Sequence, residues 1–270
     1  MKGLSCSCLA VLAALALVPL SGCGSSDNDD SGNGGGAGTS AGSGGSNAGS
    51  SGSGGKAGSG CQVDTSYNPT IDPENFVTAV DNPLWPLPVG TKMVFEGHEH
   101  VEVTVTDQTK TILGIPTIVV RDTVLDDMGE MVEDTFDWYA QDSDGNVWYM
   151  GEDTKEYSGG MVSSTFGSWE AGVDGAKPGI VMHATQPPVD EPYRQEYYAC
   201  QAEDFAELKS TGETVTVPYG TFENCLRTHE YTPLEPDLDE DKFYCPGVGF
   251  VKEIDNANGD LLELSEVVMP

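Results

Sequence analysis

Between residues 61 and 270, short runs rich in apolar and β-branched residues alternate with clusters of Gly, Pro, Asn and Asp. Such runs, bounded by turn-forming residues, predict β-strands. The expected strands are Lys92–Phe95, Val101–Thr106, Thr117–Leu125, Met131–Gln141, Val147–Met150, Tyr193–Tyr198, Thr214–Val217, Phe222–Tyr231, Lys242–Tyr244, Phe250–Ile254 and Leu261–Val268. One short helical turn is expected at Ala202–Lys209. The spacing predicts an all-β domain, a curved antiparallel sheet forming a partial barrel or a sandwich.

The segment Glu133–Asp153 contains seven carboxylates around an Asp-Ser-Asp-Gly sequence that resembles part of a calcium loop. An EF-hand loop aligned on that sequence would need an oxygen ligand at Ala140 and a bidentate Glu at Gly151. Both requirements fail, and the flanking residues are strand-like. Asp144-Gly145 instead favours a two-residue type I′ hairpin turn.

That turn sets a register in which Gln141 opposes Trp148 and Asp137 opposes Glu152. The face carrying the aromatic residues is expected to enter the core, and the acidic face is expected to meet solvent. Opposed like charges destabilise a sheet by up to ~1 kcal/mol, and a bound Ca²⁺ would reverse the sign. Asp137 and Glu152 are therefore a candidate calcium site, although a solvated acidic ladder is the preferred interpretation.

A second candidate metal site lies in the segment 96–102. On a continuous strand, period-two alternation would place Glu96, His98, His100 and Glu102 on one face. Two imidazoles flanked by carboxylates can bind Zn²⁺ or Cu²⁺. Gly97 could instead bend the chain, and the preferred interpretation is a solvated face on which each histidine lies beside a glutamate.

The N-terminus has the pattern of an export signal. Lys2 precedes an apolar run at residues 9–18 that is too short to span a bilayer. The run leads to Leu20-Ser-Gly-Cys23, which resembles the bacterial lipobox. This resemblance implies cleavage of the signal peptide 1–22 and acylation of Cys23, and Gly24 after the cysteine resembles the pattern of outer-membrane lipoproteins. Several acyl chains would anchor the protein stably.

Residues 23–60 consist almost entirely of small and polar residues. Such a chain cannot bury enough apolar surface to offset its ordering entropy, so a disordered Gly/Ser linker is expected after the lipidated cysteine. The remaining residues, 61–270, are sufficient for a single β-rich domain.

The net charge of the domain restricts its possible partners. Residues 61–270 contain 41 Asp and Glu against 10 Lys and Arg, a net charge of −31, which excludes nucleic acid as a partner.

The domain contains an even number of cysteines in an oxidising compartment, so two disulfides are expected. These cysteines are Cys61, Cys200, Cys225 and Cys245. We favour Cys225–Cys245, on consecutive strand-like segments, with Cys61–Cys200 as the second pair.

Two parts of the domain resemble a known family. Pro86-Leu-Pro-Val-Gly-Thr-Lys-Met-Val-Phe95 is one, and Pro218-Tyr-Gly-Thr-Phe-Glu-Asn-Cys225 with Phe243-Tyr-Cys-Pro-Gly-Val-Gly-Phe-Val251 is the other. These segments are similar to signatures of uncharacterised bacterial envelope proteins of the DUF3108/TapB-like group. The resemblance implies a curved antiparallel sheet, and it brings no catalytic residues.

The sequence therefore favours a non-enzymatic lipoprotein of the cell envelope, at the outer membrane or cell surface, with a binding or structural role. The expected partner is the membrane, through the lipid anchor. No nucleophile-elbow motif is present, and no resident cofactor is expected. The alternatives are a lipoprotein that binds a divalent cation, Ca²⁺ or Zn²⁺/Cu²⁺, and a carrier of a hydrophobic ligand.

Overall fold

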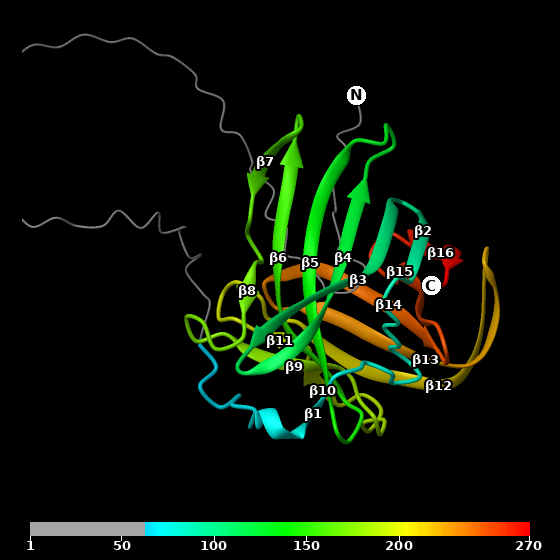
Figure 1. Ribbon diagram of the computed structural model, residues 1–270. Coiled ribbons are helices and arrows are strands. Elements are labelled where there is room, and N and C mark those ends of the chain that lie inside the picture. The colour runs from blue at the N-terminus through cyan, green and yellow to red at the C-terminus, as the bar shows by residue number, and fades with distance from the viewer. Residues whose placement is uncertain (1–62) are drawn as a thin grey trace, which may run out of the picture.

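A computed structural model describes residues 63–270 (Figure 1). They form an antiparallel sheet and one short 3-10 helix, η1 (Pro73–Asn75). The first nine strands are β1 (Phe76–Val77), β2 (Lys92–Gly97), β3 (His100–Ile112), β4 (Ile115–Leu125), β5 (Met131–Asp142), β6 (Val147–Ser158), β7 (Met161–Ser164), β8 (Trp169–Glu170) and β9 (Lys177–Met182). The others are β10 (Pro192–Arg194), β11 (Glu196–Tyr197), β12 (Phe205–Val217), β13 (Gly220–Thr232), β14 (Glu235–Cys245), β15 (Gly249–Asp255) and β16 (Leu261–Val268). The all-β prediction is confirmed, and the predicted signal peptide, Cys23, the linker and Cys61 lie outside the described residues.

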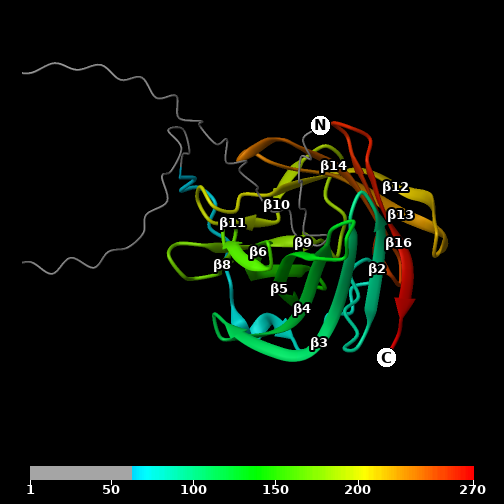
Figure 2. The same cartoon turned by 90° about the horizontal axis from the view of Figure 1, so that it is seen from above.

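The strands follow one path through the sheet, β10-β12-β13-β14-β15-β16-β2-β3-β4-β5-β6-β9-β11. The C-terminal strand β16 pairs with β2, so the two halves of the chain are joined in the middle of the sheet. Figures 1 and 2 show that the sheet curls, which brings β12–β14 opposite β4–β6 across an interior. Trp85, in the loop before β2, packs within this interior, with ring centroids 5.4 Å from Tyr139 and 5.5 Å from Tyr244.

The two ends of the sheet approach each other at residues 192–197. There β10 pairs with β12, whereas β11, two residues later, pairs with β9 at the other end. The Arg194 guanidinium lies 4.3 Å from the Phe205 ring and 4.6 Å from the Tyr197 ring, and it pairs with Asp64 at 3.1 Å. The first described residues thus hold this junction together, although the sheet is not closed into a barrel.

Most of the expected strands are present, and several are longer than predicted. The expected helical turn at Ala202–Lys209 is wrong: β12 begins at Phe205 and continues the sheet. The sequence prediction also missed β1, β7, β8 and β9. Three of these four have only two to four residues, and none shows clear alternation of buried and exposed positions.

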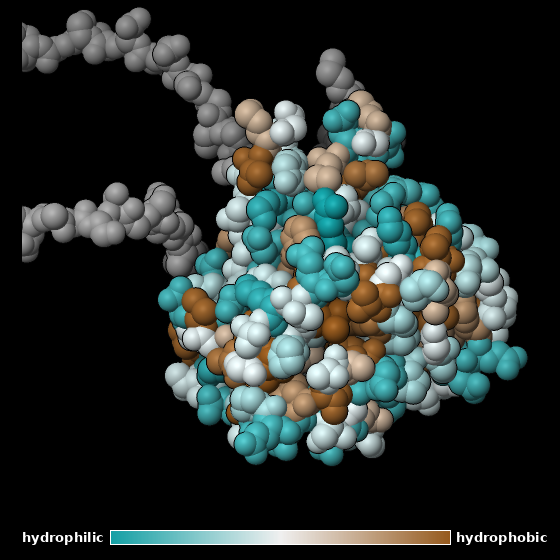
Figure 3. Space-filling model, in the orientation of Figure 1, coloured by the Kyte–Doolittle hydropathy of each residue, from teal (hydrophilic) through white to brown (hydrophobic). Residues whose placement is uncertain are grey.

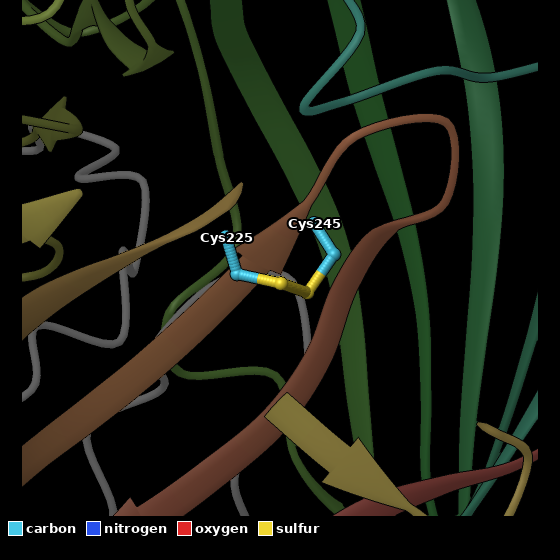
Figure 4. Close-up of a disulfide and its surroundings, with 2 residues drawn as sticks. All are labelled: Cys225 and Cys245. Carbon is cyan, nitrogen blue, oxygen red and sulfur yellow. A yellow bond between two sulfur atoms is a disulfide. The ribbon is translucent and has the colours of Figure 1, made fainter. Parts of the chain in front are cut away.

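One predicted disulfide, Cys225–Cys245, is confirmed (Figure 4). It joins β13 to β14, and both cysteines are fully buried. Cys200 is also disulfide-bonded, and its predicted partner Cys61 lies outside the described residues.

Removing the Cys225–Cys245 bond with the Cys225→Ser/Cys245→Ser double variant should destabilise the domain. The bond closes a loop with a sequence separation of 20, for which loop-closure entropy predicts a loss of ~3 kcal/mol. For a domain of this size the melting temperature should fall by ~6–12 °C. Calorimetry without reductant measures this change, and an unchanged melting temperature would contradict the prediction.

The outer surface is mixed in character. On the face drawn in Figure 3, hydrophobic patches are interrupted by hydrophilic residues. Within residues 63–270, no helix has the length and apolar character needed to cross a bilayer.

Candidate functional site: the acidic interior

The interior of the curled sheet contains many ionisable side chains. Nine carboxylates there are at most 4 % exposed: Asp122, Glu133, Asp137, Glu152, Glu196, Asp204, Glu230, Glu240 and Glu253. They share this space with the ammonium of Lys242, which is 1 % exposed. This concentration of buried acid is the feature of the domain that most requires a chemical explanation, because buried charges must be paired or neutralised.

The expectation that the acidic face of the 133–153 hairpin meets solvent is wrong. Glu133 and Asp137 on β5 and Glu152 on β6 are buried, whereas Val132 and Phe136 on the opposite face are only half-buried. Alternation separates the two faces of a strand, but the curl of the whole sheet determines which face is inside. Here the inward face is the acidic one.

The register of this hairpin is confirmed at its acidic end and wrong near the turn. Asp137 opposes Glu152 as predicted, but Gln141 pairs with Val147 instead of Trp148. The two-residue turn is replaced by a longer loop, in which Asp142 Oδ1 accepts hydrogen bonds from two backbone N–H groups, those of Asp144 and Asn146. A bulge between Asp137 and Tyr139 then restores the predicted pairing.

The bulge depends on Gly151, which has φ +133°, and a Cβ there would lie 2.3 Å from the Trp169 carbonyl oxygen. Gly151→Ala should therefore destabilise the domain by ~2–4 kcal/mol through backbone strain and overpacking. Gly129→Ala is the control, because Gly129 has φ +78° but open space around it, and it should cost only ~1 kcal/mol. Equal losses in urea denaturation would show that the close approach to Trp169 is unimportant.

Glu133, Asp137, Glu152 and Glu196 form what we call the N-terminal cluster. Their hydrogen-bond partners are neutral donors: Tyr149 Oη donates to Asp137 at 2.6 Å, and Trp169 Nε1 donates to Glu196 at 2.7 Å. Threonine hydroxyls two residues further along the strands donate to Glu133 and Glu152, each at 3.0 Å. Among the described residues, no Lys or Arg forms an ion pair with these four carboxylates.

Several oxygens of the N-terminal cluster lack any partner in the described chain: Glu133 Oε2, Asp137 Oδ2 and Glu196 Oε1 are buried without a hydrogen bond. Burial raises the pKa of both Glu133 and Asp137 to about 7, against the weaker lowering effect of their hydroxyl donors. The pKa of Glu152 is raised by burial and then by the charges of Asp137 and Glu133. Near neutral pH the cluster therefore retains protons that ordinary carboxylates would release.

Glu230, Glu240, Glu253 and Lys242 form the C-terminal cluster. Lys242 Nζ lies 3.3 Å from Glu240, 3.5 Å from Glu230 and 3.6 Å from Glu253. Burial alone would lower the pKa of Lys242, but the three carboxylates outweigh it and raise the pKa. In this cluster the chain supplies its own cation.

Two further carboxylates mark the rim of the interior. Glu156 opposes Glu133 across β5 and β6 and is half-buried. Glu235, at the start of β14, has a pKa raised to about 7 by burial and then by the charge of Glu156. A row of acids thus extends from the half-exposed rim to the buried N-terminal cluster.

The candidate Zn²⁺/Cu²⁺ residues do not share one strand face. β2 ends at Gly97, where a Cβ would lie 1.8 Å from the Leu261 carbonyl oxygen, and His98 belongs to the turn that follows. Only His100 lies between the predicted acids, 2.9 Å from Glu96 and 3.6 Å from Glu102. Metal binding by these residues stays a prediction, but His98 does not lie beside His100 on a strand face as the prediction required.

Throughout the described part of the chain, no group of three or more His, Cys, Asp or Glu side chains is arranged to hold a metal ion. The N-terminal cluster is therefore not a preformed metal centre. Any cation that binds there has to draw carboxylates together, at the expense of their hydroxyl hydrogen bonds.

The sequence prediction identified Asp137 and Glu152 but missed most of the interior acids. A signal for them does exist: acidic residues alternate with Thr or Lys in Glu133-x-Thr135-x-Asp137, Glu152-x-Thr154, Thr228-x-Glu230 and Glu240-x-Lys242. Alternation of this kind normally indicates a solvated face. It becomes evidence for a polar interior only when the curl of the sheet is known.

Comparison with known proteins identifies no relative. No protein-family model matches the chain, and no curated protein or solved structure is detectably similar to it. The resemblance to the DUF3108/TapB-like group stays a prediction.

Proposed function

We propose that this protein is a lipid-anchored, non-enzymatic protein of the bacterial cell envelope, at the outer membrane or cell surface, with a binding or structural role. The observation that carries the proposal is Leu20-Ser-Gly-Cys23, placed directly after the apolar run of an export signal. The residues that follow are typical of a flexible tether. The described residues, 63–270, then form one antiparallel sheet.

The burial of the ionisable groups supports a non-enzymatic role. Paired carboxylates can act as general acid and base, but they must reach a substrate. Asp137 and Glu152 are 0 % and 1 % exposed, and a tyrosine and a threonine hydroxyl donate to them. This arrangement is suited to holding protons or a small ion rather than to turning over a substrate.

Carriage of a hydrophobic ligand is less well supported than a polar binding role. The interior that a carried lipid would occupy contains the two acidic clusters and the aromatic residues around Trp85. An apolar hollow lined by Pro69, Ile71, Leu113 and Ala176 lies outside these clusters. A carrier would instead need a mostly apolar cavity that encloses its ligand.

Replacing the lipidated residue tests the proposal. Cys23→Ser should move the protein from the membrane fraction to the soluble fraction and abolish labelling by radioactive palmitate, because both depend on the acylated cysteine. Cys200→Ser is the control for general loss of a cysteine and should leave labelling intact. Unchanged membrane association and labelling in Cys23→Ser would refute the lipid anchor.

A further inference from the structure

The outer face of β12, β13 and β14 carries a hollow of about 440 Å³ near the β13–β14 turn. Small-ligand sites in proteins typically measure roughly 300–1,000 Å³, and the hollow falls within this range. The residues that line it alternate along the strands with residues of the C-terminal cluster. The hollow therefore lies on the opposite side of the sheet from the acidic interior.

One wall of the hollow is an irregular stretch of β14. The register of β13 against β14 shifts between Tyr231 and Thr232, which leaves residues 236–238 without a partner on β13. Pro236 in this stretch and Pro233 in the turn line the hollow. Proline fixes the backbone φ, so this wall keeps its shape before a ligand binds. Bulges of this kind are common next to functional sites.

The floor of the hollow is aromatic. Tyr231 and His229 line it, and their ring centroids are 5.3 Å apart. Phe205 on β12 lies nearly parallel to Tyr231, at an interplanar angle of 12° and a centroid distance of 5.7 Å, and supports that ring. All three rings are half-buried, so part of their surface is open to a ligand. The face of an aromatic ring carries partial negative charge, which attracts the weakly positive C–H bonds of a sugar ring.

Charged side chains around the rings hold one another in position. Lys209 Nζ lies 2.8 Å from Asp190 and 2.9 Å from Glu207. On the other side, Asp239 Oδ1 lies 3.4 Å from His229 Nδ1. The hollow thus presents an ammonium donor and carboxylate acceptors whose positions are set by the protein itself. Such preorganisation lowers the entropy cost of binding.

The charges at the hollow favour a neutral ligand. The Lys209 ammonium lines the hollow and repels a cation, whereas the net charge of the chain, −32, repels an anion. A hydroxyl group both donates and accepts hydrogen bonds, so a polyhydroxyl ligand can use the ammonium and the carboxylates together. Neutral sugars combine such hydroxyl groups with an apolar ring face that packs on an aromatic side chain.

We propose that this hollow binds a neutral oligosaccharide. A sugar ring packs against Tyr231, and its hydroxyl groups bond to Glu207, Lys209 and Asp239. Because the hollow lies on the outer face and half-buried residues line it, it accepts a segment within a longer sugar chain.

The oligosaccharide site gives a ligand class to the binding role proposed above, on which it rests, but it does not need the lipid anchor. Loss of acylation in Cys23→Ser would leave the hollow unchanged, and absence of sugar binding would leave the anchor unchanged. The two proposals therefore fail separately.

Titration calorimetry with neutral hexasaccharides is the direct measurement. The probes are cellohexaose, laminarihexaose, maltohexaose, xylohexaose and N-acetylchitohexaose, added to the full-length protein in a detergent without sugar groups. At least one probe should bind with a Kd on the order of 0.1 mM, because an open site covers only part of its ligand. Spermine and a galacturonate oligomer represent a cationic and an anionic occupant, and neither should displace the bound hexasaccharide at equal concentration.

Two variants locate the binding. Tyr231→Ala removes the packing surface and should weaken binding of the best probe by ~tenfold. Lys209→Met removes a hydrogen-bond donor and should weaken it by about fivefold. Lys209 is a surface side chain, so this variant keeps the test decisive if loss of the Tyr231 ring disturbs packing.

Tyr219→Ala is the matched control. Tyr219 is an exposed aromatic residue in the turn before β13, beside Phe222 and outside the hollow, and its loss should leave binding unchanged. Melting temperatures show whether each variant is folded. The proposal is overturned if no probe binds at millimolar concentration, or if spermine or galacturonate displaces the sugar. It is equally overturned if Lys209→Met binds like wild type, or if Tyr219→Ala loses as much affinity as Tyr231→Ala.

Discussion

Lys242→Met is expected to destabilise the domain by ~3–5 kcal/mol at pH 8, because it leaves three buried carboxylates without their cation. Lys242 Nζ lies within 3.6 Å of Glu230, Glu240 and Glu253, and all four residues are at most 3 % exposed. Methionine has a similar length and is apolar, so the loss should come from charge rather than from a cavity.

The pH dependence of this loss distinguishes charge from packing. Burial raises the pKa of Glu240 and of Glu253, so these two carboxylates take up protons more readily at pH 5, and Lys242→Met should cost less at pH 5 than at pH 8. Adding Glu240→Gln and Glu253→Gln should recover much of the stability at pH 8, because two of the three uncompensated charges are then absent.

Lys252→Met is the matched control. Lys252 lies on the neighbouring strand β15 and pairs with Glu263 at 2.7 Å, but both side chains are about one-fifth exposed. Loss of such a pair should cost at most ~1 kcal/mol. Urea denaturation of the four proteins at both pH values measures the effects, and equal losses for the two lysine variants would contradict the role assigned to Lys242.

The strands were predictable because local chemistry determines them. Turn residues such as Asp144-Gly145 and Asn258-Gly259 bound runs of alternating residues, and the structure places strands on both sides of each. The Cys225–Cys245 bond followed from the same reasoning, since it joins neighbouring strands. The register of β5 against β6 was only partly predictable. The Asp142 side chain accepts hydrogen bonds within the turn, and between this turn and the bulge at Gly151 the pairing of the two strands is displaced by one residue from the predicted pairing.

The grouping of acidic residues inside the curled sheet could not be predicted from local sequence patterns. Lys242 meets acids from β13, β14 and β15, so recognising the cluster requires the register of three strands at once. Glu196 reaches the N-terminal cluster only because β11 pairs with β9 at the junction of the sheet ends. The prediction that acids face water follows average behaviour, and the curl of this sheet reverses it.

Folding stability is expected to fall as the pH rises from about 4 to above 7, which is unusual for a domain rich in carboxylates. The pKa of Asp137 is raised by burial from 3.8 to about 7, and that of Glu133 from 4.5 to about 7. In this range the native state holds protons that the unfolded chain releases, and stability must therefore decrease with pH. Below about pH 4 both states are protonated and the effect disappears.

The expected size of this stability loss follows from the shift in the pKa of Asp137. A single isolated group shifted as far as Asp137 would contribute a loss on the order of 4 kcal/mol across the range. Chemical denaturation at pH 4, 6 and 8 in the presence of a chelator measures it. The chelator matters because a bound cation would replace the proton and oppose the loss.

The Asp137→Asn/Glu152→Gln variant distinguishes the contribution of the buried acids to this pH dependence from the contribution of the acidic surface. The repulsion between surface charges also grows with pH. The variant leaves the surface charges unchanged but removes two groups with raised pKa. Its stability should therefore fall less steeply with pH, and above pH 7 it should exceed that of wild type. The Glu96→Gln/Glu102→Gln variant removes the same number of acids from the exterior and should keep the steep profile. Parallel profiles for wild type and the interior variant would mean that surface repulsion alone produces the pH dependence, and that the buried acids are ionised to the same extent in the folded and unfolded chain.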